Sequence, residues 1–572
     1  MNLRWEIFRC PPELRLQLSK KLDIPPLIAQ LLIKRGIVDP REGERFLTPS
    51  LNHLYDPFLM KDVDRGVERI IKAIKEREKI LIYGDYDVDG VTACALLVDF
   101  LRSLGAYTSY YIPHRLKEGY GLNPEAVKRI AAQGVRLLIC VDCGISDQEE
   151  IMLARELGMD TIVIDHHEIP TQLPPAHAIL DPLQSDCPFP FKGLAGVGVT
   201  FNFVVALRSR LRDLGFWQDC SEPNLRRYLD LVALGTIADI VPLVDMNRIL
   251  VKYGLRELEN STKPGILALK EVSGMGEGEV STGQVAFRLA PRLNAGGRVA
   301  SGQMGVELLL AKELAQAKRI AEELDGANRE RQTIEEKIYK EAKELIQQEG
   351  LMHRSGLVLS CDDWHPGVIG IVASKIAEEL WRPTVLIALD GEQGKGSARS
   401  IVGFHLYEGL KECGKYLLGF GGHKYAAGLR ISREKIREFS EVFEQVVKSK
   451  VRAQDLTPAI FIDAEVDLRE ITPELLNYLS LFPPYGAANP KPLFCTKGRL
   501  PVHDIRTVGE SSLKFKMREA GVAYEIIGFG MGSLAPQLGE ELRIAFYPQM
   551  NDWEGLKKLQ LELRAVDIDQ KD

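Results

Sequence analysis

Apolar and polar residues follow one another along the chain in a pattern that predicts repeated strand–helix units. From residue 79, a short apolar run (KILIYG) precedes a stretch with helical periodicity (VTACALLVDFLRSLG), and the same order recurs around RLLICVD and TIVID. Strands that alternate with helices are typical of a parallel, doubly wound α/β sheet. Functional residues in such sheets follow the carboxyl ends of the strands.

The remainder of the chain differs in pattern. Residues 311–350 lack proline, mix both charge signs and carry apolar residues at helical spacing, so we expect one long connecting helix, or a helix broken near Gly326. Short alternating segments near the end predict the strands of a small barrel or sandwich. We expect an N-terminal extension (1–45), an α/β domain (46–310), the connecting helix (311–350), a smaller α/β domain (351–452) and a β-rich domain (453–572).

The composition is that of an ordinary globular protein of several domains, with 572 residues, 45% hydrophobic and 27% charged. The formal net charge of −7 argues against a protein that coats nucleic acid through a uniformly positive surface. Nine scattered cysteines do not suggest a disulfide framework, and Cys140 and Cys143 have no second ligand pair for zinc. The sequence has neither a run of 18 apolar residues nor the features of a signal peptide, so we expect a cytoplasmic protein without a membrane segment.

Acidic residues and histidines follow the predicted strands. YGDYDVDG contributes Asp85, Asp87 and Asp89, LICVDCG contributes Asp142, TIVIDHH contributes Asp165, His166 and His167, and LGTIADIVPL ends a helical stretch with Asp239. These positions share one edge of a parallel sheet, where several carboxylates repel one another unless a cation compensates. Carboxylate and imidazole ligands without thiolate suit Mn²⁺ or Mg²⁺, and their number is enough for two ions that share a bridging carboxylate.

Simpler explanations exist for each motif. An Asp-x-Asp turn after a strand can serve only as a turn and a helix cap, and Asp239 can be an ordinary helix-end residue. The spacing of a calcium-binding EF-hand is absent, and neither GEQGKGS nor GLAGVGVTF matches a phosphate-binding glycine motif. Four acidic sites at successive element ends are not explained by capping alone, so the metal interpretation is favoured.

The motif D-Y-D-V-D-G at 85–90, together with D-H-H at 165–167, resembles the DHH phosphoesterase superfamily. The RecJ branch is indicated by PHRLKEGYGLN (113–123), LVALGTIADIVPL (231–243), PRLNAGGR (291–298), WHPGVIGIVASKI (364–376), GSARS (396–400), GGHKYAAG (421–428) and PYGAANPKPLF (484–494), in the order of that family. The resemblance implies a DHH catalytic domain, a DHH-associated substrate-binding domain and an OB-like domain. It also implies an exonuclease of DNA repair and recombination that degrades single-stranded DNA from the 5′ end.

The resemblance further implies roles for the acidic cluster. The metal ligands are expected to be Asp87, Asp89, Asp142, His166 and Asp239, with Asp142 bridging two Mn²⁺ or Mg²⁺ ions. Among the catalytic residues, Asp85 and Asp165 are expected to support these ligands, while His167 contacts the scissile phosphate or the leaving oxygen. The implied reaction is in-line hydrolysis of a phosphodiester without a covalent intermediate.

The second α/β domain is expected to bind the 5′ end. GSARS offers small residues, a hydroxyl and an arginine in a loop, and GGHKYAAG offers a glycine turn, although two structural turns are the simpler alternative. Arginines in the RecJ-like motifs of the first domain can bind phosphate oxygens in a bidentate manner. The expected substrate-binding residues are Arg115, Arg298, Ser397, Arg399, Gly421, Gly422 and His423.

By the same resemblance, the β-rich domain binds single strands through a basic groove and aromatic side chains. It contains Lys491, Lys497, Arg499, Lys514 and Lys516 near Phe494, Phe515 and Tyr524, although any half-exposed strand shows such a mixture. The expected partners are single-stranded DNA with a free 5′ end, a single-strand-binding protein and a RecQ-type helicase. A monomer is expected because both α/β domains lie on one chain.

Three other functions remain open. A DHH phosphodiesterase for short oligonucleotides or cyclic dinucleotides shares both α/β domains, although the RecJ-type motifs and the β-rich domain favour a polymer. A non-catalytic replication scaffold would tend to lose ligands, and here every expected ligand is present. A pyrophosphatase is disfavoured because Tyr83, and not histidine, stands four residues before Asp87.

Overall fold

The computed structural model describes residues 4–114, 118–218, 221–276, 278–299, 302–509, 511–553 and 556–567, apart from the side chains of residues 298, 299, 453, 454, 552, 553, 556 and 557. It divides into two compact units. One unit comprises Met1–Leu54, Pro242–Ile249 and Ala459–Asp572, and the other comprises Tyr55–Val241 and Leu250–Pro458.

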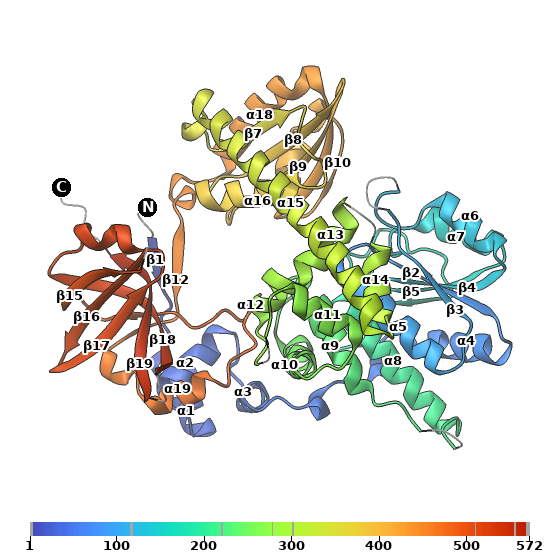
Figure 1. Ribbon diagram of the computed structural model, residues 1–572, viewed down its shortest axis with the longest axis horizontal. Helices are drawn as coiled ribbons and strands as arrows, with labels where there is room; N and C mark the ends of the chain where they lie inside the picture. The colour runs from blue at the N-terminus through green and yellow to red at the C-terminus, as the bar shows by residue number, and fades with distance from the viewer. Residues whose placement is uncertain are drawn as a thin grey trace. The chain divides into compact units, whose positions relative to one another are not determined.

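A parallel five-stranded sheet lies at the centre of the first α/β domain, as the sequence predicts (Figure 1). Its order is β3-β2-β4-β5-β6, with β2 (Lys79–Gly84), β3 (Thr108–Tyr111), β4 (Val135–Val141), β5 (Asp160–Ile164) and β6 (Ala178–Leu180). The chain adds β3 on one side of β2 and β4 on the other, which makes the carboxyl end of β2 and β4 the topological switch point. Ligands of such sheets bind in the crevice at this point.

Helices cover both faces of this sheet, which accounts for its apolar strands (Figure 1). The helices that pack on its strands are α4 (Val63–Lys75), α5 (Val88–Ser103), α6 (Pro124–Ala132), α7 (Gln148–Glu156) and α8 (Gly196–Asp213). The chain then continues through α9 (Leu229–Ala238), α10 (Asp245–Glu259), α11 (Pro264–Val272), α12 (Thr282–Gln284), a π-helix (Val285–Leu289), α13 (Ala290–Val299) and α14 (Gln303–Leu310). Because α5 packs against β2, α8 and α9, it is apolar on nearly all sides.

The connecting helix is a single element, α15 (Leu314–Gln348), of 35 residues (Figure 1). It continues through Gly326 without a break, so the alternative of a broken helix is wrong. Its first half packs against α11, α13 and α14, and its second half packs Ile338, Ala342 and Ile346 against α16 (Ile369–Leu380).

The second α/β domain has a mixed sheet in the order β10-β11-β9-β8-β7. Its elements are β7 (Leu357–Cys361), β8 (Thr384–Asp390), β9 (Gln393–Arg399), β10 (Leu417–Gly422), β11 (Ala426–Ser432), α17 (Leu406–Glu412) and α18 (Ile436–Lys450), in addition to α16. One face packs against α15 and α16, and the other packs against α17 and α18.

The β-rich domain contains a closed barrel, in agreement with an OB-like fold. Its strands are β12 (Ala459–Ile462), β13 (Ala464–Val466), β14 (Phe494–Thr496), β15 (Leu500–Val508), β16 (Ser512–Glu519), β17 (Val522–Gly528), β18 (Glu541–Trp553) and β19 (Leu556–Asp567), with helix α19 (Pro473–Leu479). Each of β15, β16, β17, β19 and β18 pairs with the next, and β18 also pairs with β15, so these five strands form a ring.

The N-terminal segment belongs to the same unit as this barrel. Strand β1 (Arg4–Ile7) pairs in parallel with β12, and helices α1 (Pro12–Leu22), α2 (Pro26–Lys34) and α3 (Pro40–Leu47) contribute to the barrel's hydrophobic core. Leu31 and Phe46, for example, are buried in one cluster with Phe494 and Phe546. Among the described helices, none combines the length and hydropathy that a membrane crossing requires.

Candidate metal centre and active site

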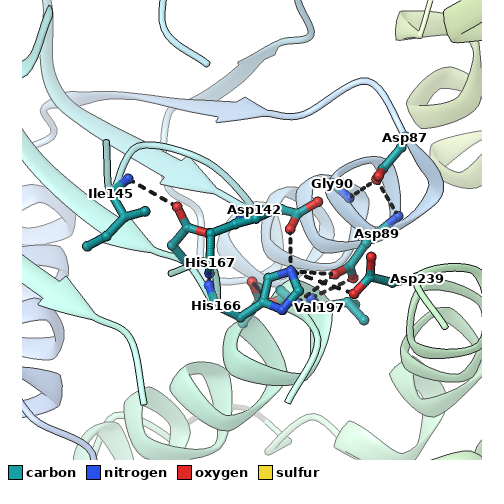
Figure 2. A network of polar contacts seen from close by, with 12 residues as sticks. Asp87, Asp89, Gly90, Asp142, Ile145, His166, His167, Val197 and Asp239 are labelled. Carbon is teal, nitrogen blue, oxygen red and sulfur yellow. Dashed lines mark hydrogen bonds and ion pairs between the residues drawn. The ribbon is translucent and has the colours of Figure 1, made fainter. Parts of the chain in front are cut away.

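The acidic residues predicted from the strand ends come together at the switch point of the parallel sheet (Figure 2). Asp85, Asp87 and Asp89 follow β2, Asp142 follows β4, and Asp165, His166 and His167 follow β5, while Asp239 caps the carboxyl end of α9. Asp85, Asp89, Asp142 and Asp165 are buried, with at most 4% of each exposed. The fold thus brings together carboxylates that are up to 154 residues apart in sequence.

The imidazole of His166 lies at the centre of this cluster (Figure 2). Its Nε2 is 3.1 Å from Asp142 Oδ1, 3.7 Å from Asp239 Oδ2 and 3.8 Å from Asp89 Oδ2. Three side chains from three different elements therefore point at one histidine nitrogen, which is the arrangement expected of ligands around a metal ion.

Three overlapping groups have ligand atoms close enough to hold a cation. They are Asp89, His166 and Asp239; Asp85, Asp87 and Asp142; and Asp142, His166 and His167, each with its atoms within 4.8 Å of one another. Asp142 belongs to two of the groups, as a bridging ligand would. Asp142 Oδ1 and His166 Nε2 are also buried without a geometrically acceptable hydrogen bond in the described part of the chain, so the residues fit Mn²⁺ or Mg²⁺.

Backbone N–H groups fix two of the carboxylates. Asp87 is the N-cap of α5, and its Oδ1 accepts hydrogen bonds from the N–H groups of Asp89 and Gly90, so this residue does cap the helix, as the simpler explanation of the motif had it. Asp89 accepts hydrogen bonds of 2.6 and 2.8 Å from the N–H groups of Gly196 and Val197, at the start of α8. The positive end of the α8 dipole thus faces the cluster.

Burial and mutual repulsion hold protons on the cluster in the absence of metal. Burial, and then the charges of Asp239 and Asp87, raise the pKa of Asp89 well above its usual range. Burial and the charges of Asp89, Asp87, Asp85 and Asp239 do the same to the pKa of Asp142. Burial, together with Asp87, raises the pKa of Asp239 to about 7. A bound divalent cation would remove the cause of these shifts.

The two histidines have opposite protonation tendencies. Burial and the neighbouring His167 lower the pKa of His166 to about 4, so His166 is neutral and able to bind a metal. Burial alone would lower the pKa of His167, but its hydrogen bond to Asp165 and the charge of that residue raise the pKa to about 9. His167 Nδ1 is 2.7 Å from Asp165 Oδ1, so Asp165 orients the ring.

Two residues of this region were missed in the sequence. The Tyr120 hydroxyl lies 3.2 Å from His167 Nδ1, and the two rings meet edge to face. Asp181 follows β6, is fully buried, and has a pKa that burial raises to about 7. Asp181 carries the same signal as the other acids, a carboxylate after an apolar run, whereas Tyr120 lies in a loop whose pattern gives no indication of its partner.

Part of the predicted 5′-end site comes together in the second α/β domain. Ser397 pairs across the sheet with Gly428, which pairs with Gly421 on the far side, and Arg399 donates a hydrogen bond to the Ser397 hydroxyl. The sheet face beside Ser397 and Arg399 is therefore bare of side chains at two neighbouring positions.

The expectation of loops around these residues was wrong. Residues 396–399 belong to β9, and Gly421 and Gly422 end β10, because these segments complete a mixed sheet that glycine content conceals. Of Gly421, Gly422 and His423, only the exposed His423 lies in the turn between β10 and β11. Arg115 is outside the described residues. Arg298 lies in α13, but its side chain is not described.

In the barrel, the basic and aromatic residues are engaged in structure. Lys497, Lys514 and Lys516 form ion pairs, for example between Lys516 and Asp504 at 2.8 Å, and Lys491 lies 3.5 Å from Glu562. Phe494 and Phe515 are core residues, while Tyr524 packs against that core. Arg499 donates hydrogen bonds to the carbonyls of Glu541 and Asp567. The two phenylalanines are therefore not free to stack on bases.

Three family models match the chain in succession. The DHH family N-terminal domain matches residues 79–236, the DHHA1 domain matches residues 353–449, and the RecJ OB domain matches residues 462–565. The first match spans β2 to α9 and thus every residue of the metal cluster except Asp239.

Whole-chain relatives agree with these matches. The chain is 38% identical over 573 residues to the single-stranded-DNA-specific exonuclease RecJ of Bacillus subtilis, covering 99% of this chain and 71% of that protein. Crystal structures of RecJ from Thermus thermophilus in complex with Mn²⁺ and with Mg²⁺ match with TM-scores of 0.83 and 0.78, at 30% and 28% identity. They cover 99% of this chain and 80% and 79% of theirs. The chain belongs to the RecJ family of DHH proteins.

Proposed function

We propose that this protein is a metal-dependent exonuclease that degrades single-stranded DNA from the 5′ end by hydrolysing phosphodiester bonds, in DNA repair and recombination. One observation carries the proposal: three overlapping ligand groups meet around Asp142 and His166 at the switch point of a RecJ-type DHH domain. Mn²⁺ or Mg²⁺ is the cofactor, since solved RecJ relatives contain these ions and the donor set consists of carboxylates and imidazoles.

We assign the ligand roles to Asp87, Asp89, Asp142, His166 and Asp239, with Asp142 shared between two sites. Bound ions would act as Lewis acids that activate water and stabilise the phosphoryl oxygens. The protein holds the ligands in place through its backbone. The first N–H groups of α8 donate hydrogen bonds to Asp89, and Asp87 is the N-cap of α5. Asp85, buried beside Asp142, supports the second group.

His167 is assigned to the scissile phosphate or the leaving oxygen. Its side chain is 37% exposed, whereas Asp165 is wholly buried, so the imidazole is the accessible member of the pair. With the pKa of His167 raised to about 9, the ring carries a proton at neutral pH and can donate it to a departing oxygen. Asp165 holds the ring in place because its Oδ1 accepts a hydrogen bond from the His167 imidazole Nδ1 and another from the His167 backbone N–H.

The 5′ end is assigned to the face of β9 that carries Ser397 and Arg399. Side chains alternate between the two faces along a strand, and Ala398, between Ser397 and Arg399, packs into the core with α18. Ser397 and Arg399 therefore face the other way. An arginine beside two side-chain-free positions suits a terminal phosphate. Gly421, Gly422, His423, Arg115 and Arg298 complete the assigned substrate-binding set.

Degradation assays test the nuclease assignment. Asp142→Ala should reduce Mn²⁺-dependent hydrolysis of a single strand at least about 1,000-fold, because both ligand groups lose a shared carboxylate. A duplex of the same sequence, and a dinucleotide, should be poor substrates for the unaltered enzyme. Faster hydrolysis of the dinucleotide than of the polymer would instead favour an oligonucleotide phosphodiesterase.

The 5′-end assignment has its own test. Arg399→Ala should slow degradation of a 5′-phosphorylated strand roughly tenfold or more without changing Mn²⁺ affinity, since a phosphate contact of an arginine is lost. Arg437→Ala is the matched control, because Arg437 is 91% exposed on α18, which packs on the opposite face of the sheet. Equal effects of the two substitutions would remove Arg399 from the site.

We also propose a cytoplasmic monomer that works with a single-strand-binding protein and a RecQ-type helicase. Support for the monomer is that one chain carries the DHH, DHHA1 and OB domains together. An enzyme restricted to single strands requires partners that expose and present them, and pull-down with each purified partner would test this.

A further inference from the structure

We propose that Asp147 is a positioning residue for the reaction: it holds residues 118–122, here called the Tyr120 segment, so that the Tyr120 hydroxyl reaches His167 and the backbone of Asp142. The inference goes beyond the assigned metal ligands but rests on the proposed role of His167. All of these residues lie in the first α/β domain, and among the described residues Asp147 belongs to none of the three metal-ligand groups.

The Tyr120 hydroxyl contacts two parts of the active site. It lies 3.2 Å from His167 Nδ1 and donates a 3.4 Å hydrogen bond to the Asp142 carbonyl. Asp142 has a φ of 61°, in the left-handed region that residues other than glycine occupy infrequently, and such a conformation persists only when the surrounding structure imposes it. One hydroxyl therefore supports both the proposed proton donor and the backbone of the proposed bridging ligand.

The Tyr120 side chain depends on its backbone for this position. The residue is 49% exposed, so core packing restrains it little. Its neighbours Gly119 and Gly121 both have positive φ, 87° and 81°, and glycine is the residue with the greatest conformational freedom. The Tyr120 segment therefore keeps one conformation only if its backbone groups are bound to the rest of the domain.

Asp147, in the loop after β4 that also carries Asp142, binds this backbone. Its Oδ2 accepts a 2.7 Å hydrogen bond from the N–H of Leu122, a buried residue whose N–H requires an acceptor. Gly121 lies so close that a Cβ there would be 2.6 Å from Asp147 Oδ1. Although Asp147 is the N-cap of α7, its side chain makes no capping hydrogen bond within the described part of the chain. Its carboxylate thus binds the Tyr120 segment in place of the helix it precedes.

Other contacts complete the attachment of the Tyr120 segment. The hydroxyl of Tyr83, a buried residue of β2, donates a 3.0 Å hydrogen bond to the Gly121 carbonyl. At the other end, the Glu118 carboxylate accepts hydrogen bonds from the Tyr111 hydroxyl at 2.6 Å and from the His114 N–H at 2.8 Å. The segment is therefore attached on both sides of its central tyrosine.

Steady-state kinetics on a 5′-labelled single strand with Mg²⁺ tests the inference, and circular dichroism confirms that each variant is folded. Asp147→Ala removes the acceptor of the Leu122 N–H and should lower kcat about fivefold with KM nearly unchanged, because the contact between Tyr120 and His167 is lost. Asp147→Asn keeps a side-chain oxygen that can accept this hydrogen bond and should recover most of the lost rate.

A double-mutant cycle distinguishes positioning from a merely structural contribution. Adding Asp147→Ala to Tyr120→Phe should lower kcat by less than about twofold further, because the hydroxyl that Asp147 positions is already missing. Effects of the two substitutions that multiply independently would overturn the inference.

Gly121→Ala is a second probe, which keeps the carboxylate but separates it from the Tyr120 segment. The added methyl would collide with Asp147 Oδ1, so kcat should fall at least about threefold more than in Gly119→Ala. Gly119→Ala is the matched control, because Gly119 has a similar positive φ but a Cβ there would meet nothing within 4 Å. Equal losses in the two variants would assign the effect to backbone strain alone and contradict the inference.

His167→Gln separates the inference from the proposed function on which it rests. If folded Asp147→Ala hydrolyses the strand at the unaltered rate while Tyr120→Phe and His167→Gln are slow, the positioning role of Asp147 is overturned and the proposed role of His167 stands. If His167→Gln itself keeps the unaltered rate, the proposed role of His167 fails, and the inference fails with it.

Discussion

At the scale of single residues, Asp165 shows how one buried carboxylate sets the state of a neighbour. It accepts hydrogen bonds from the N–H groups of Ile145 and His166 as well as from His167, so it stays ionised although buried. That charge in turn keeps a proton on His167.

The first prediction concerns this pair. Asp165→Asn should bring the pKa of His167 down from about 9 toward its ordinary value near 6.5, because the charge that stabilises the imidazolium is removed. The ratio of hydrolysis rates at pH 8.5 and pH 6 should then fall roughly 10-fold to 100-fold. A pH–rate profile with Mg²⁺ measures it, with His167→Gln as the control that lacks this titration. An unchanged alkaline limb would contradict the assigned role.

Tyr120→Phe is the second prediction. The Tyr120 hydroxyl lies 3.2 Å from His167 Nδ1 and 3.4 Å from the Asp142 carbonyl. Loss of one such hydrogen bond, worth about 1 kcal/mol, should lower kcat about fivefold and leave KM nearly unchanged. Tyr107→Phe, an exposed tyrosine in the loop before β3, is the control. A change in KM alone would indicate substrate binding instead.

At this scale, the sequence predicted the acidic residues of the cluster but not the neighbouring residues that contact them. Asp142 and His166 could be found because each follows an apolar strand, and the sheet topology brings strand ends together. Tyr120 could not, since its contact with His167 depends on the path of a loop. Asp181 could have been found by the rule that located Asp142, applied to the short strand β6.

At the scale of secondary-structure elements, the start of α8 connects two parts of the metal centre. Its first N–H groups hold Asp89, and Gly196 lies so close to Asp142 that a Cβ would be 2.7 Å from Asp142 Oδ1. The GLAGVGVTF stretch thus lies against two of the predicted metal ligands.

Gly196→Ala is the third prediction. The methyl group would collide with the Asp142 carboxylate, so Mn²⁺-dependent activity should fall at least about 100-fold while the melting temperature changes little. Gly198→Ala, two residues further along α8, is the matched control, because its Cβ would come closest to Leu194 Cδ2, at 3.2 Å, and this atom is the flexible end of the side chain. Comparable activity of the two variants would contradict this geometry.

The pattern of residues predicted most elements but failed where glycine dominates. The strands β2, β4 and β5 are apolar runs, and α15 has helical periodicity over its whole length. The segment around Ser397 resembles a loop because small residues hide the alternation of a strand. It is nevertheless a strand, because it pairs with β8 on one side and with β11 on the other.

At the scale of the whole molecule, the net charge of −7 has a local explanation. Part of the acidic excess is the buried cluster, which has room for cations. The association of the N-terminal helices with the barrel could not be predicted, because the partners are more than 400 residues apart and no local pattern links them.

The fourth prediction follows from the buried cluster. Without metal, the raised pKa of Asp239 gives stability that is complete below about pH 4 and is lost as the pH rises through about 7, when the carboxylate must ionise in the folded state. Asp89 and Asp142 act in the same direction. Mn²⁺ should therefore raise the melting temperature more at pH 8 than at pH 6, as measured by differential scanning calorimetry. An equal increase at both values would contradict the pKa shifts.

We propose that this metal centre degrades single strands from the 5′ end. The most direct measurement is digestion of one single-stranded oligonucleotide, labelled at either the 5′ or the 3′ end, with Mn²⁺, Mg²⁺ or a chelator. We expect immediate release of the 5′ label with either ion, late release of the 3′ label, and no release with the chelator or with Asp142→Ala. Release of the 3′ label first, or degradation that persists in the chelator, would contradict it.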